Sequence, residues 1–449
     1  MTQTYKYLHF ISFQSLVNWS VAHLLNRDLG FTKHYPFVRI GDVLRRSAML
    51  VTIEDDILYM QVTLKTNGGG AVLRDKKLGK DIGTKKQYLA AEGQFIMSKI
   101  DARNGAFGVV TKELDGAIVT GDFPLFDVDT DKINPTYLYL LSSTQPFVQY
   151  AQSCSRGTTN RQRIDIDAFL SLQIPLPSLE EQNDIISAYN SALAQSALYT
   201  RQAQDIDTQI EAYWKNILGI ETLQETTKKK TGYLQFCSFK YIEKWGYDFI
   251  RRGDINNSQT KYPTVRISDI CDISSGGTPA RGRKEYYNGT IPWIKTGELK
   301  NEELFDTEEK ITELGLANSS AKLYPKGSLV IAMYGATIGK TAKLGVNATT
   351  NQACAVLFHI QNTRISTDYL WLYIQSQTDK LKSMAYGGAQ PNINAGIIAN
   401  YNVPLPPLAI QNEIVSHISA LRAEQKALQQ QSLSLRSHAQ HQFTQTIFD

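Results

Sequence analysis

The stretch from Ile174 to Ile185 reads IPLPSLEEQNDI, and the stretch from Val403 to Ile414 reads VPLPPLAIQNEI. Seven of the twelve positions are identical, and the two stretches begin 229 residues apart. One such match in a long chain can arise by chance. A tandem duplication would produce further matches at nearly the same offset, so the rest of the sequence tests the idea.

Two more pairs of segments repeat at nearly that offset. The segment YPFVRIGDVL at Tyr35 to Leu44 agrees at six of ten positions with YPTVRISDIC at Tyr262 to Cys271, which begins 227 residues later. A weaker pair is GQFIMSKIDARNG at Gly93 to Gly105 and GSLVIAMYGATIG at Gly327 to Gly339, each an apolar, strand-like run followed by a glycine-bearing turn. Three features in the same order indicate that about half of the chain is duplicated.

Each copy of the opening motif predicts an extended connector that leads into a helix. The alternating prolines of IPLP and VPLP exclude helix and cannot donate to a strand ladder. In the first copy, Ser178 with Glu181 three residues later has the pattern of a capping box. In the second copy, Pro406 and Pro407 suit the first turn of a helix.

The predicted helices run from Leu179 to about Leu218 and from Leu408 to about Ile447. At ~38 residues each, they would be about 57 Å long. Their equal length, matched entry motifs and one-sided apolar stripes favour pairing as a coiled coil, which a rough two-fold axis would make antiparallel. The alternative is two unrelated surface helices. The stripe residues are Ile186, Tyr189, Leu193, Ala203, Ile206, Ile210, Tyr213 and Ile217, and then Ile414, Ile418, Leu421, Leu428, Leu435 and Phe443.

The predicted fold class is α+β, with two globular domains separated by two long helices that pack as an antiparallel coiled coil with pseudo-two-fold duplication. The segments before each connector are rich in short apolar runs, aromatic residues and glycine turns, which is typical of such domains. The charge run ETTKKKTG, at 225–232, is a natural linker. The predicted boundaries are 1–173 for the first domain, 174–224 for the connector and central helix, 225–402 for the linker and second domain, and 403–449 for the connector and C-terminal helix.

Composition restricts the function only broadly. The chain has 449 residues, which favours more than one domain, and a formal net charge of +4, which is too small to identify nucleic-acid binding unless the cations cluster. Four cysteines are scattered without CxxC pairs, which fits a reducing cytosol. The start lacks a basic signal-peptide region, and no run of about 18 apolar residues follows. We expect a cytoplasmic protein without a membrane partner.

Two motifs resemble catalytic sites. GATIGKT, at Gly335 to Thr341, resembles a phosphate-binding loop but has three residues between its glycines instead of four. NPTY, at Asn134 to Tyr137, resembles an adenine methyltransferase motif, but a helix start capped by Asn134 explains it more simply. The seven histidines form no metal-ligand pattern. We therefore expect no catalytic residue and no metal site in this chain.

Basic residues cluster beside glycine turns in both halves. Arginine and lysine bind phosphates, and arginine, asparagine and glutamine can read base edges, so these clusters favour DNA binding. Any one basic loop can also be a solvated surface, and the hypothesis rests on both halves having them. The candidate DNA-binding residues are Lys76, Lys77, Lys85, Lys86, Arg103, Arg156, Arg161 and Arg163 in the first half, and Thr278, Arg281, Arg283, Lys284, Lys295, Lys340, Lys343, Gln390, Asn392 and Asn394 in the second. We expect Arg281, Arg283 and Lys284 to lie on a flexible loop.

With these motifs together, the sequence resembles the specificity subunits of Type I restriction-modification enzymes over essentially its whole length. The resemblance is carried by the paired PLP-x-L-x-x-QN-[DE]-I motifs, by the GGTP loop with IPWIKTGEL at Gly276 to Leu299, and by YGATIGKTA at Tyr334 to Ala342. It implies two target-recognition domains that each read one half of a split DNA sequence. The first domain has no equivalent of GGTP or WIKTGEL, so its DNA-contacting loops are less defined.

The resemblance also implies partners and cofactors. The long helices would act as a ruler and a docking site for two methyltransferase subunits and for restriction subunits with endonuclease and translocase activity. S-adenosylmethionine, ATP and magnesium would be bound by those subunits, and this chain would hold no cofactor. The alternatives are a fused restriction or methylation enzyme with its own active site, and a coiled-coil scaffold that does not bind DNA.

Overall fold

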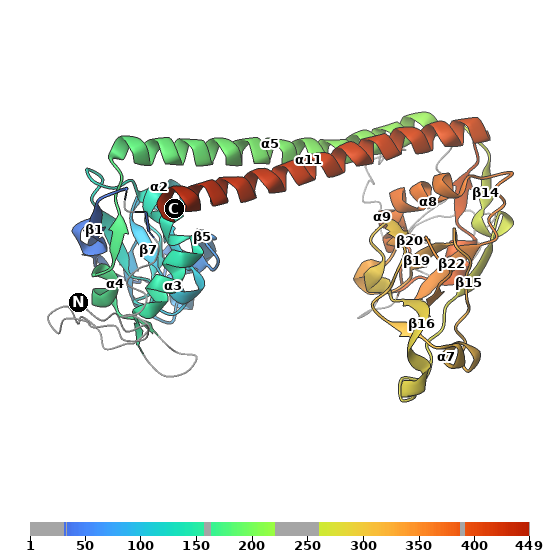
Figure 1. Cartoon of the computed structure of the whole chain (residues 1–449), viewed down its shortest axis with the longest axis horizontal. Helices are drawn as coiled ribbons and strands as arrows, with labels where there is room; N and C mark the ends of the chain where they lie inside the picture. Colours follow the sequence, from blue (N-terminus) through green and yellow to red (C-terminus); the bar gives the residue numbers. More distant parts are fainter. Residues whose placement is uncertain (1–30, 33, 157–162, 221–259, 387–390, 449) are drawn as a thin grey trace, which may run out of the picture. The chain divides into compact units, whose positions relative to one another are not determined.

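The computed structural model describes residues 31, 32, 34–156, 163–220, 260–386 and 391–448. The chain divides into two compact units, Met1–Thr200 with Gln429–Asp449, and Arg201–Leu428. Each unit contains a part of both long helices, α5 and α11 (Figure 1). Within the described residues, no helix is both long enough and apolar enough to span a membrane.

The first unit is built on an antiparallel sheet with the strand order β2-β10-β7-β8. Its middle strand β7 is fully buried, and helices α2, α3 and α4 contribute Tyr137, Phe147 and Phe169 to the core that packs against it. The bounds are β2 (Leu44–Ser47), β7 (Phe95–Met97), β8 (Phe107–Val109), β10 (Leu125–Val128), α2 (Pro135–Ser142), α3 (Gln145–Ser153) and α4 (Ile166–Leu170).

A second sheet of the first unit has five strands in the order β3-β6-β9-β4-β5. Most of it comes from the chain between β2 and β7, and β5 lies at one end of the strand order. A separate two-stranded pair joins β11 to β12. The bounds are β3 (Leu50–Thr52), β4 (Leu58–Lys65), β5 (Gly70–Leu78), β6 (Lys86–Leu89), β9 (Ile118–Val119), β11 (Ser155–Arg156) and β12 (Arg163–Ile164).

The second unit repeats the first of these sheets with the order β15-β22-β19-β20 and adds β17 beside β20. Buried strands β19 and β22 pack against helix α8, where Tyr369, Leu370 and Tyr373 enter the same core. The bounds are β15 (Asp272–Ser275), β17 (Glu302–Leu304), β19 (Leu329–Ala332), β20 (Thr341–Leu344), β22 (Cys354–Phe358), α8 (Thr367–Ser376), α9 (Thr378–Ser383) and α10 (Ala395–Ala399).

The second sheet of this unit is different from its counterpart. It has three strands in the order β18-β16-β21, and it mixes antiparallel with parallel pairing. Strands β16 and β18 come from the chain between β15 and β19, the same interval that supplies most of the five-stranded sheet in the first unit. The bounds are β16 (Tyr287–Ile294), β18 (Lys310–Ile311), β21 (Thr349–Thr350) and the adjacent α7 (Glu313–Ala317).

These sheet orders confirm the predicted duplication. The weak pair of apolar runs becomes strand β7 in one unit and strand β19 in the other, at matching places in matching sheets. The repeat therefore covers the first sheet and the elements around it. The second sheets are where the two units diverge in strand number and pairing.

The two strongest sequence repeats lie against each other within each unit. Strand β1 (Phe37–Arg39) pairs with β13 (Gln173–Pro175), and β14 (Thr264–Arg266) pairs with β23 (Asn402–Pro404), both antiparallel. The connectors are extended as predicted, but they also form a short ladder that the sequence did not indicate. The ladder is possible because the residue after each proline supplies the donor: the Leu176 N–H donates to the Pro36 oxygen, and the Leu405 N–H donates to the Pro263 oxygen, both at 2.8 Å.

A buried glutamine holds each connector to its helix and domain. Gln182 donates to the carbonyl oxygens of Lys132 and Pro177 and accepts from the Asn134 N–H at 2.8 Å. Both Gln182 and its counterpart Gln411 have no exposed surface. One amide side chain thus ties together the first turn of α5, the end of the connector and the N-cap of α2.

Gln411 repeats this arrangement in the second unit. It donates to the carbonyl oxygens of Arg364 and Pro406 and accepts from the Ser366 N–H at 2.7 Å. A buried tyrosine adds an equivalent bond in each unit, from the Tyr137 hydroxyl to the Pro175 oxygen at 3.0 Å and from the Tyr369 hydroxyl to the Pro404 oxygen at 2.8 Å. The repeated QN motif therefore marks a repeated junction between domain and helix.

The long helices have the predicted bounds, Leu179–Leu218 for α5 and Leu408–Phe448 for α11. The predicted capping box is confirmed, because the Ser178 N–H donates to the Glu181 carboxylate at 2.9 Å and the Glu181 N–H donates to the Ser178 hydroxyl at 3.3 Å. The helix start at Asn134 is also confirmed, since the Asn134 side chain accepts from the Thr136 N–H and Pro135 opens α2.

The helices pair antiparallel in both units, as predicted. In the first unit Tyr189 packs near Phe443, and Ser196 bonds to Ser432. Residues later in α5 therefore contact residues earlier in α11, which is the antiparallel arrangement. In the second unit Gln425 donates to the Ala203 oxygen at 2.9 Å, and the Tyr213 ring lies 4.2 Å from that of His417. The apolar stripe predicts most of the buried face but does not include Ser196, Ser432 or Trp214, all of which are buried.

Candidate nucleic-acid interface

Four of the eight candidate cations of the first unit lie on the five-stranded sheet or directly beside it. Lys76 and Lys77 belong to β5, Lys86 is the first residue of β6, and Lys85 directly precedes it. Lys85 pairs with Asp55 at 2.6 Å, and Lys77 lies 3.5 Å from Asp75. Within the part of the chain that the structure describes, the exposed side chains of Lys76 and Lys86 make no ion pair. These two lysines have charge available for a DNA phosphate.

The candidate arginines of the first unit are less uniform. Arg103 is partly buried in the turn Ala102–Asn104 and has a contact of its own. The backbone of Arg156 pairs with that of Arg163 between β11 and β12, and the Arg163 guanidinium pairs with Asp122 at 3.2 Å. Arg161 lies outside the described residues. The structure thus places Arg156 and Arg163 next to each other, away from the five-stranded sheet in strand order.

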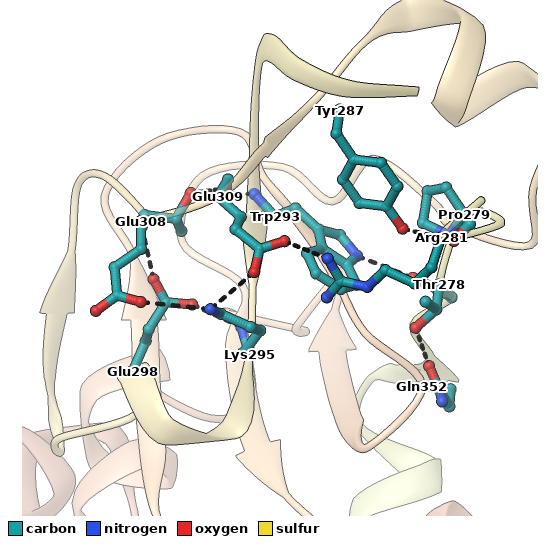
Figure 2. Close-up of polar contacts among 12 residues, drawn as sticks. Thr278, Pro279, Arg281, Tyr287, Trp293, Lys295, Glu298, Glu308, Glu309 and Gln352 are labelled. Atoms are coloured by element: carbon teal, nitrogen blue, oxygen red, sulfur yellow. Dashed lines mark hydrogen bonds and ion pairs between the residues drawn. The ribbon is translucent and has the colours of Figure 1, made fainter. Parts of the chain in front are cut away.

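In the second unit, the GGTP loop is fixed by close backbone packing. A side chain at Gly276 would overlap the backbone of Thr350 and Asn351, and one at Gly277 would overlap Ser320 and Ala321. The Gly277 N–H donates to the Thr350 oxygen at 2.8 Å, and the Thr278 hydroxyl bonds to Gln352 (Figure 2). Glycine is needed here because no other residue permits this approach. Thr278 is therefore used within the fold.

Arg281 follows this loop and is held on several sides (Figure 2). Its Nη1 lies 2.6 Å from a carboxylate oxygen of Glu309, and its guanidinium carbon lies 4.9 Å from the ring centre of Tyr287 and 4.8 Å from that of Trp293. Cation–π contacts and a charge-assisted hydrogen bond restrain the same group. The expectation of a flexible loop is wrong at Arg281, because its ring and carboxylate partners come from the β16–β18 sheet and the segment that leads into it.

Glu309 also binds Lys295, at 3.0 Å, and Lys295 lies 3.3 Å from Glu308. The hydrogen bonds from Arg281 and then Lys295 lower the pKa of Glu309 below its usual value of 4.5. Glu298 closes the group, since it accepts from the backbone N–H groups of Lys295 and Glu308. Sequence reasoning selected the two cations of this group but none of its carboxylates, because the spacing between Arg281 and Glu309 has no local pattern.

Lys295 lines an acidic groove. The groove has a volume of about 790 Å³. A phosphate backbone approaching the groove would meet five carboxylates and two ammonium groups. One of these ammonium groups, that of Lys295, is already paired with Glu308 and Glu309. This face of the second unit is thus unfavourable for DNA. Its lining residues are Lys295, Gly297, Glu298, Lys300, Glu302, Glu303, Leu304, Phe305, Asp306, Thr307 and Glu308.

Of the remaining candidate cations of the second unit, some are paired with a carboxylate of the protein and others are free to contact a phosphate. Lys343 is paired with Asp368 at 2.8 Å. Arg283 makes only a 3.4 Å contact with Glu285, and its side chain is 66% exposed. Lys284 and Lys340 are exposed, and neither makes an ion pair to another described residue. Arg283 and Lys284 are therefore the available cations of the GGTP loop.

The amide-rich segment near Asn392 contributes mainly to the fold. Asn392 exchanges two backbone hydrogen bonds with Tyr386, at 2.9 and 3.0 Å. The Asn394 side chain caps α10 by accepting from the Ile397 N–H, and its amide donates to the Tyr386 hydroxyl at 2.9 Å. Gln390 lies outside the described residues. The hydrogen-bonding groups of Asn394 are thus used for a helix cap and a tyrosine contact.

The GATIGKT loop has the wrong continuation for a phosphate-binding loop. Gly335–Thr337 forms a short 3-10 turn, and the chain after Gly339 and Lys340 enters strand β20. A phosphate-binding loop needs the N-terminus of a helix at this point. Gly339 has a φ of 80°, and a side chain there would crowd Thr378. The glycines therefore serve a tight turn between two paired strands. In the described ranges, no group of three or more His, Cys, Asp or Glu side chains is suited to hold a metal ion.

Known proteins are similar to this chain in sequence and in fold. The family model for the Type I restriction modification DNA specificity domain matches residues 28–206 and again residues 259–435. The chain belongs to this family. The resemblance stated from the motifs is thereby confirmed, and the two matched segments are two DNA specificity domains of the Type I restriction-modification kind.

Several specificity subunits are similar in sequence. The HindI specificity subunit of Haemophilus influenzae is 22% identical over 385 residues, which cover 75% of this chain and 83% of the relative. The MjaIX subunit of Methanocaldococcus jannaschii is 28% identical over 181 residues, or 39% of this chain and 41% of the relative. The EcoR124I/EcoR124II subunit of Escherichia coli is 26% identical over 180 residues. The last two matches span less than half of those subunits, 41% and 44%.

A solved structure supports the fold. A chain from a study of complex assembly and conformational transition of the type I R-M system aligns with a TM-score of 0.61 and 18% identity. The alignment covers 93% of this specificity-domain chain and 97% of the other. The predicted class, two α+β domains with two long antiparallel helices, is confirmed by this likeness and by the strand and helix pairing.

Proposed function

We propose that this chain is the non-catalytic specificity subunit of a Type I restriction-modification complex. It reads an asymmetric, bipartite target in double-stranded DNA, one half-site with residues 1–173 and the other with residues 225–402. Two methyltransferase subunits and the restriction subunits dock on it. Those partners bind S-adenosylmethionine, ATP and magnesium and carry out adenine methylation and ATP-dependent cleavage.

The observation that carries this proposal is the contrast between the repeated and the divergent sheets. Equivalent first sheets and equivalent glutamine junctions give both units one frame. The five-stranded and three-stranded second sheets present different surfaces, and these sheets with their loops carry Lys76, Lys86, Arg283 and Lys284. Two different readers on one frame favour two different half-sites, hence an asymmetric target.

The long helices support a fixed spacing between half-sites. Each is ~40 residues long, which corresponds to about 60 Å, and a DNA turn is about 34 Å. A paired, continuous helix resists bending more than a flexible linker does. The proposal therefore assigns the spacer length to α5 and α11 and the base choice to the domains.

The experiment is to express the subunit with its methyltransferase partner in a host and to sequence the modified adenines. The expected result is one bipartite, non-palindromic motif with a constant spacer. A purified complex should also bind that motif with a strong salt dependence. Methylation by the specificity chain alone would favour the fused-enzyme alternative, and the lack of any DNA shift by the purified complex would favour the scaffold alternative.

A further inference from the structure

We propose that Arg281 and Glu309 form a positioning clasp for the loop from Gly276 to Lys284, and that Arg283 and Lys284 make the phosphate contacts of this loop. Arg281 is then a positioning residue that acts through its neighbours. The proposal rests on the proposed reading of DNA by the second domain. It assigns different roles to Arg281 and to the pair Arg283 and Lys284, which the sequence alone does not distinguish.

The groups that hold Arg281 also hold the loop backbone (Figure 2). The Trp293 indole N–H donates to the Gly277 oxygen at 2.9 Å, and the Tyr287 hydroxyl donates to the Pro279 oxygen at 2.5 Å. The same two rings lie under the Arg281 guanidinium, and Trp293 is 1% exposed. The loop is thus attached to β16 both through its carbonyl groups and through the arginine side chain.

The charge of Arg281 is compensated by neighbouring carboxylates of the protein, although its side chain is 55% exposed. Arg281 and Lys295 supply two positive charges to a group in which Glu298, Glu308 and Glu309 supply three negative ones. A phosphate that approached Arg281 would compete with Glu309 at 2.6 Å and would be repelled by the neighbouring carboxylates. A phosphate contact is therefore less favourable here than at the two cations that follow.

Arg283 and Lys284 have the opposite surroundings. The Arg283 N–H donates to the Ala280 oxygen at 3.0 Å, so Arg283 ends a tight turn that begins at Ala280 and contains Arg281, and Lys284 follows this turn. Both are exposed, and the contact between Arg283 and Glu285 is long for an ion pair, at 3.4 Å. Surface contacts of this kind contribute little and are readily exchanged for a phosphate.

The deciding experiment compares Glu309→Gln with Glu308→Gln in the purified complex bound to its target duplex. Each variant removes one negative charge and one partner of Lys295, but only Glu309→Gln releases Arg281. If Arg281 positions the loop, Glu309→Gln should bind about 10-fold more weakly than Glu308→Gln, with the loss confined to the second half-site. If Arg281 contacts a phosphate itself, removal of the competing carboxylate should leave binding unchanged or make it tighter, which would overturn the proposal.

A double-mutant cycle measures whether the losses of DNA affinity caused by two sets of substitutions are additive. This additivity distinguishes a positioning role of Arg281 from a direct contact with DNA. Arg281→Lys keeps the charge but loses the planar group that stacks on two rings, so it should behave like Glu309→Gln. Added to Arg283→Ala/Lys284→Ala, it should cause no further loss of affinity. An additive loss would show direct contact and would contradict the clasp.

The double variant Arg283→Ala/Lys284→Ala tests the phosphate contacts even if the Arg281 and Glu309 variants fail to fold. Arg283→Ala/Lys284→Ala should fold normally and should reduce the slope of log K against log salt by about 0.9 per lost contact, or about 1.8 in total. An unchanged slope would refute the assignment even if the clasp variants proved unstable. A wild-type complex that shows no sequence-specific binding would instead refute the proposed function of the chain.

Discussion

The Ser196 and Ser432 hydroxyls lie 2.8 Å apart between α5 and α11, where both side chains are buried. The Thr200 hydroxyl reaches Ser432 at 2.9 Å, and the Arg436 Nε donates to the Ser196 hydroxyl at 2.8 Å. A polar group in an otherwise apolar helix seam is satisfied only when the helices have one alignment. This network therefore selects the register of the helix pair in the first unit.

Replacing Ser196 with Ala should leave the Ser432 hydroxyl and the Arg436 Nε with fewer buried partners. We expect a loss of about 1 to 3 kcal/mol in the free energy of unfolding. Urea denaturation of the full chain measures it. The matched control is Ser191→Ala on the exposed face of the same helix, which should change stability by less than about 0.5 kcal/mol. Equal effects of the two changes would contradict the register role.

The junction glutamines should be more sensitive than their neighbours in sequence. Gln411→Ala would leave the Ser366 N–H and two carbonyl groups without their buried partner. The expected cost is about 1 to 3 kcal/mol for each group that water cannot reach. Thermal unfolding of the full chain measures it, and Gln182→Ala should have a similar effect through the first unit. Exposed Asn412→Ala is the control, and a comparable loss there would argue against the junction.

A lengthened helix pair should lengthen the DNA spacer. Four residues inserted after Ala203 alone would break the alignment with α11, so we expect a destabilised, poorly active complex. Four residues inserted after Ala203 together with four after Gln425 add about 6 Å and a rotation of roughly 40°, and keep the helices aligned. The sequenced motif should then keep both half-sites and gain about two base pairs of spacer. An unchanged spacer in an active double insertion would refute the ruler hypothesis.

The available lysines of the five-stranded sheet should act on the first half-site. Lys76→Gln and Lys86→Gln should each weaken binding to all sequences and reduce the slope of log K against log salt by about 0.9 if each meets one phosphate. Salt titrations on duplexes randomised in one half-site measure the effect. Lys132→Gln is a control of equal charge change, because Lys132 pairs with Asp129 at 2.7 Å outside this sheet. A slope change as large in the control would show that only net charge matters.

The clasp should respond to acid in a defined range. The pKa of Glu309 is lower in the folded protein than its usual value of 4.5, so its ion pairs stabilise the fold fully above that pH. The stabilisation is lost as the pH falls through the lowered pKa of the folded state. The stability difference between wild type and Glu309→Gln should thus be constant from pH 7 to about pH 5.5 and shrink below pH 4.5. Urea midpoints over this range measure it, and a difference that grows on acidification would contradict the assignment.

Much of the frame was predictable because its signals are local or repeated. The capping box at Ser178, the helix start at Asn134 and the bounds of α5 depend on residues within one helical turn or on periodicity. The duplication followed from three matched segments in order. The same reasoning could not predict the individual strands of the second sheets, because short strands such as β18 have too few residues to show an alternating pattern.

The sequence by itself determined the duplication, the two long helices and the family of this specificity chain, because repeated motifs and the helical spacing of apolar residues are local features of the sequence. Only the tertiary structure decided which cations are available for DNA. Arg281 and Arg283 are two residues apart and both have exposed side chains, yet Arg281 lies 2.6 Å from Glu309, 28 residues away, whereas Arg283 has a 3.4 Å contact with Glu285. Likewise, Ser196 meets a partner 236 residues away. The physical reason is that an ion pair or a buried hydrogen bond depends on distance in space, which the fold sets and the linear order does not.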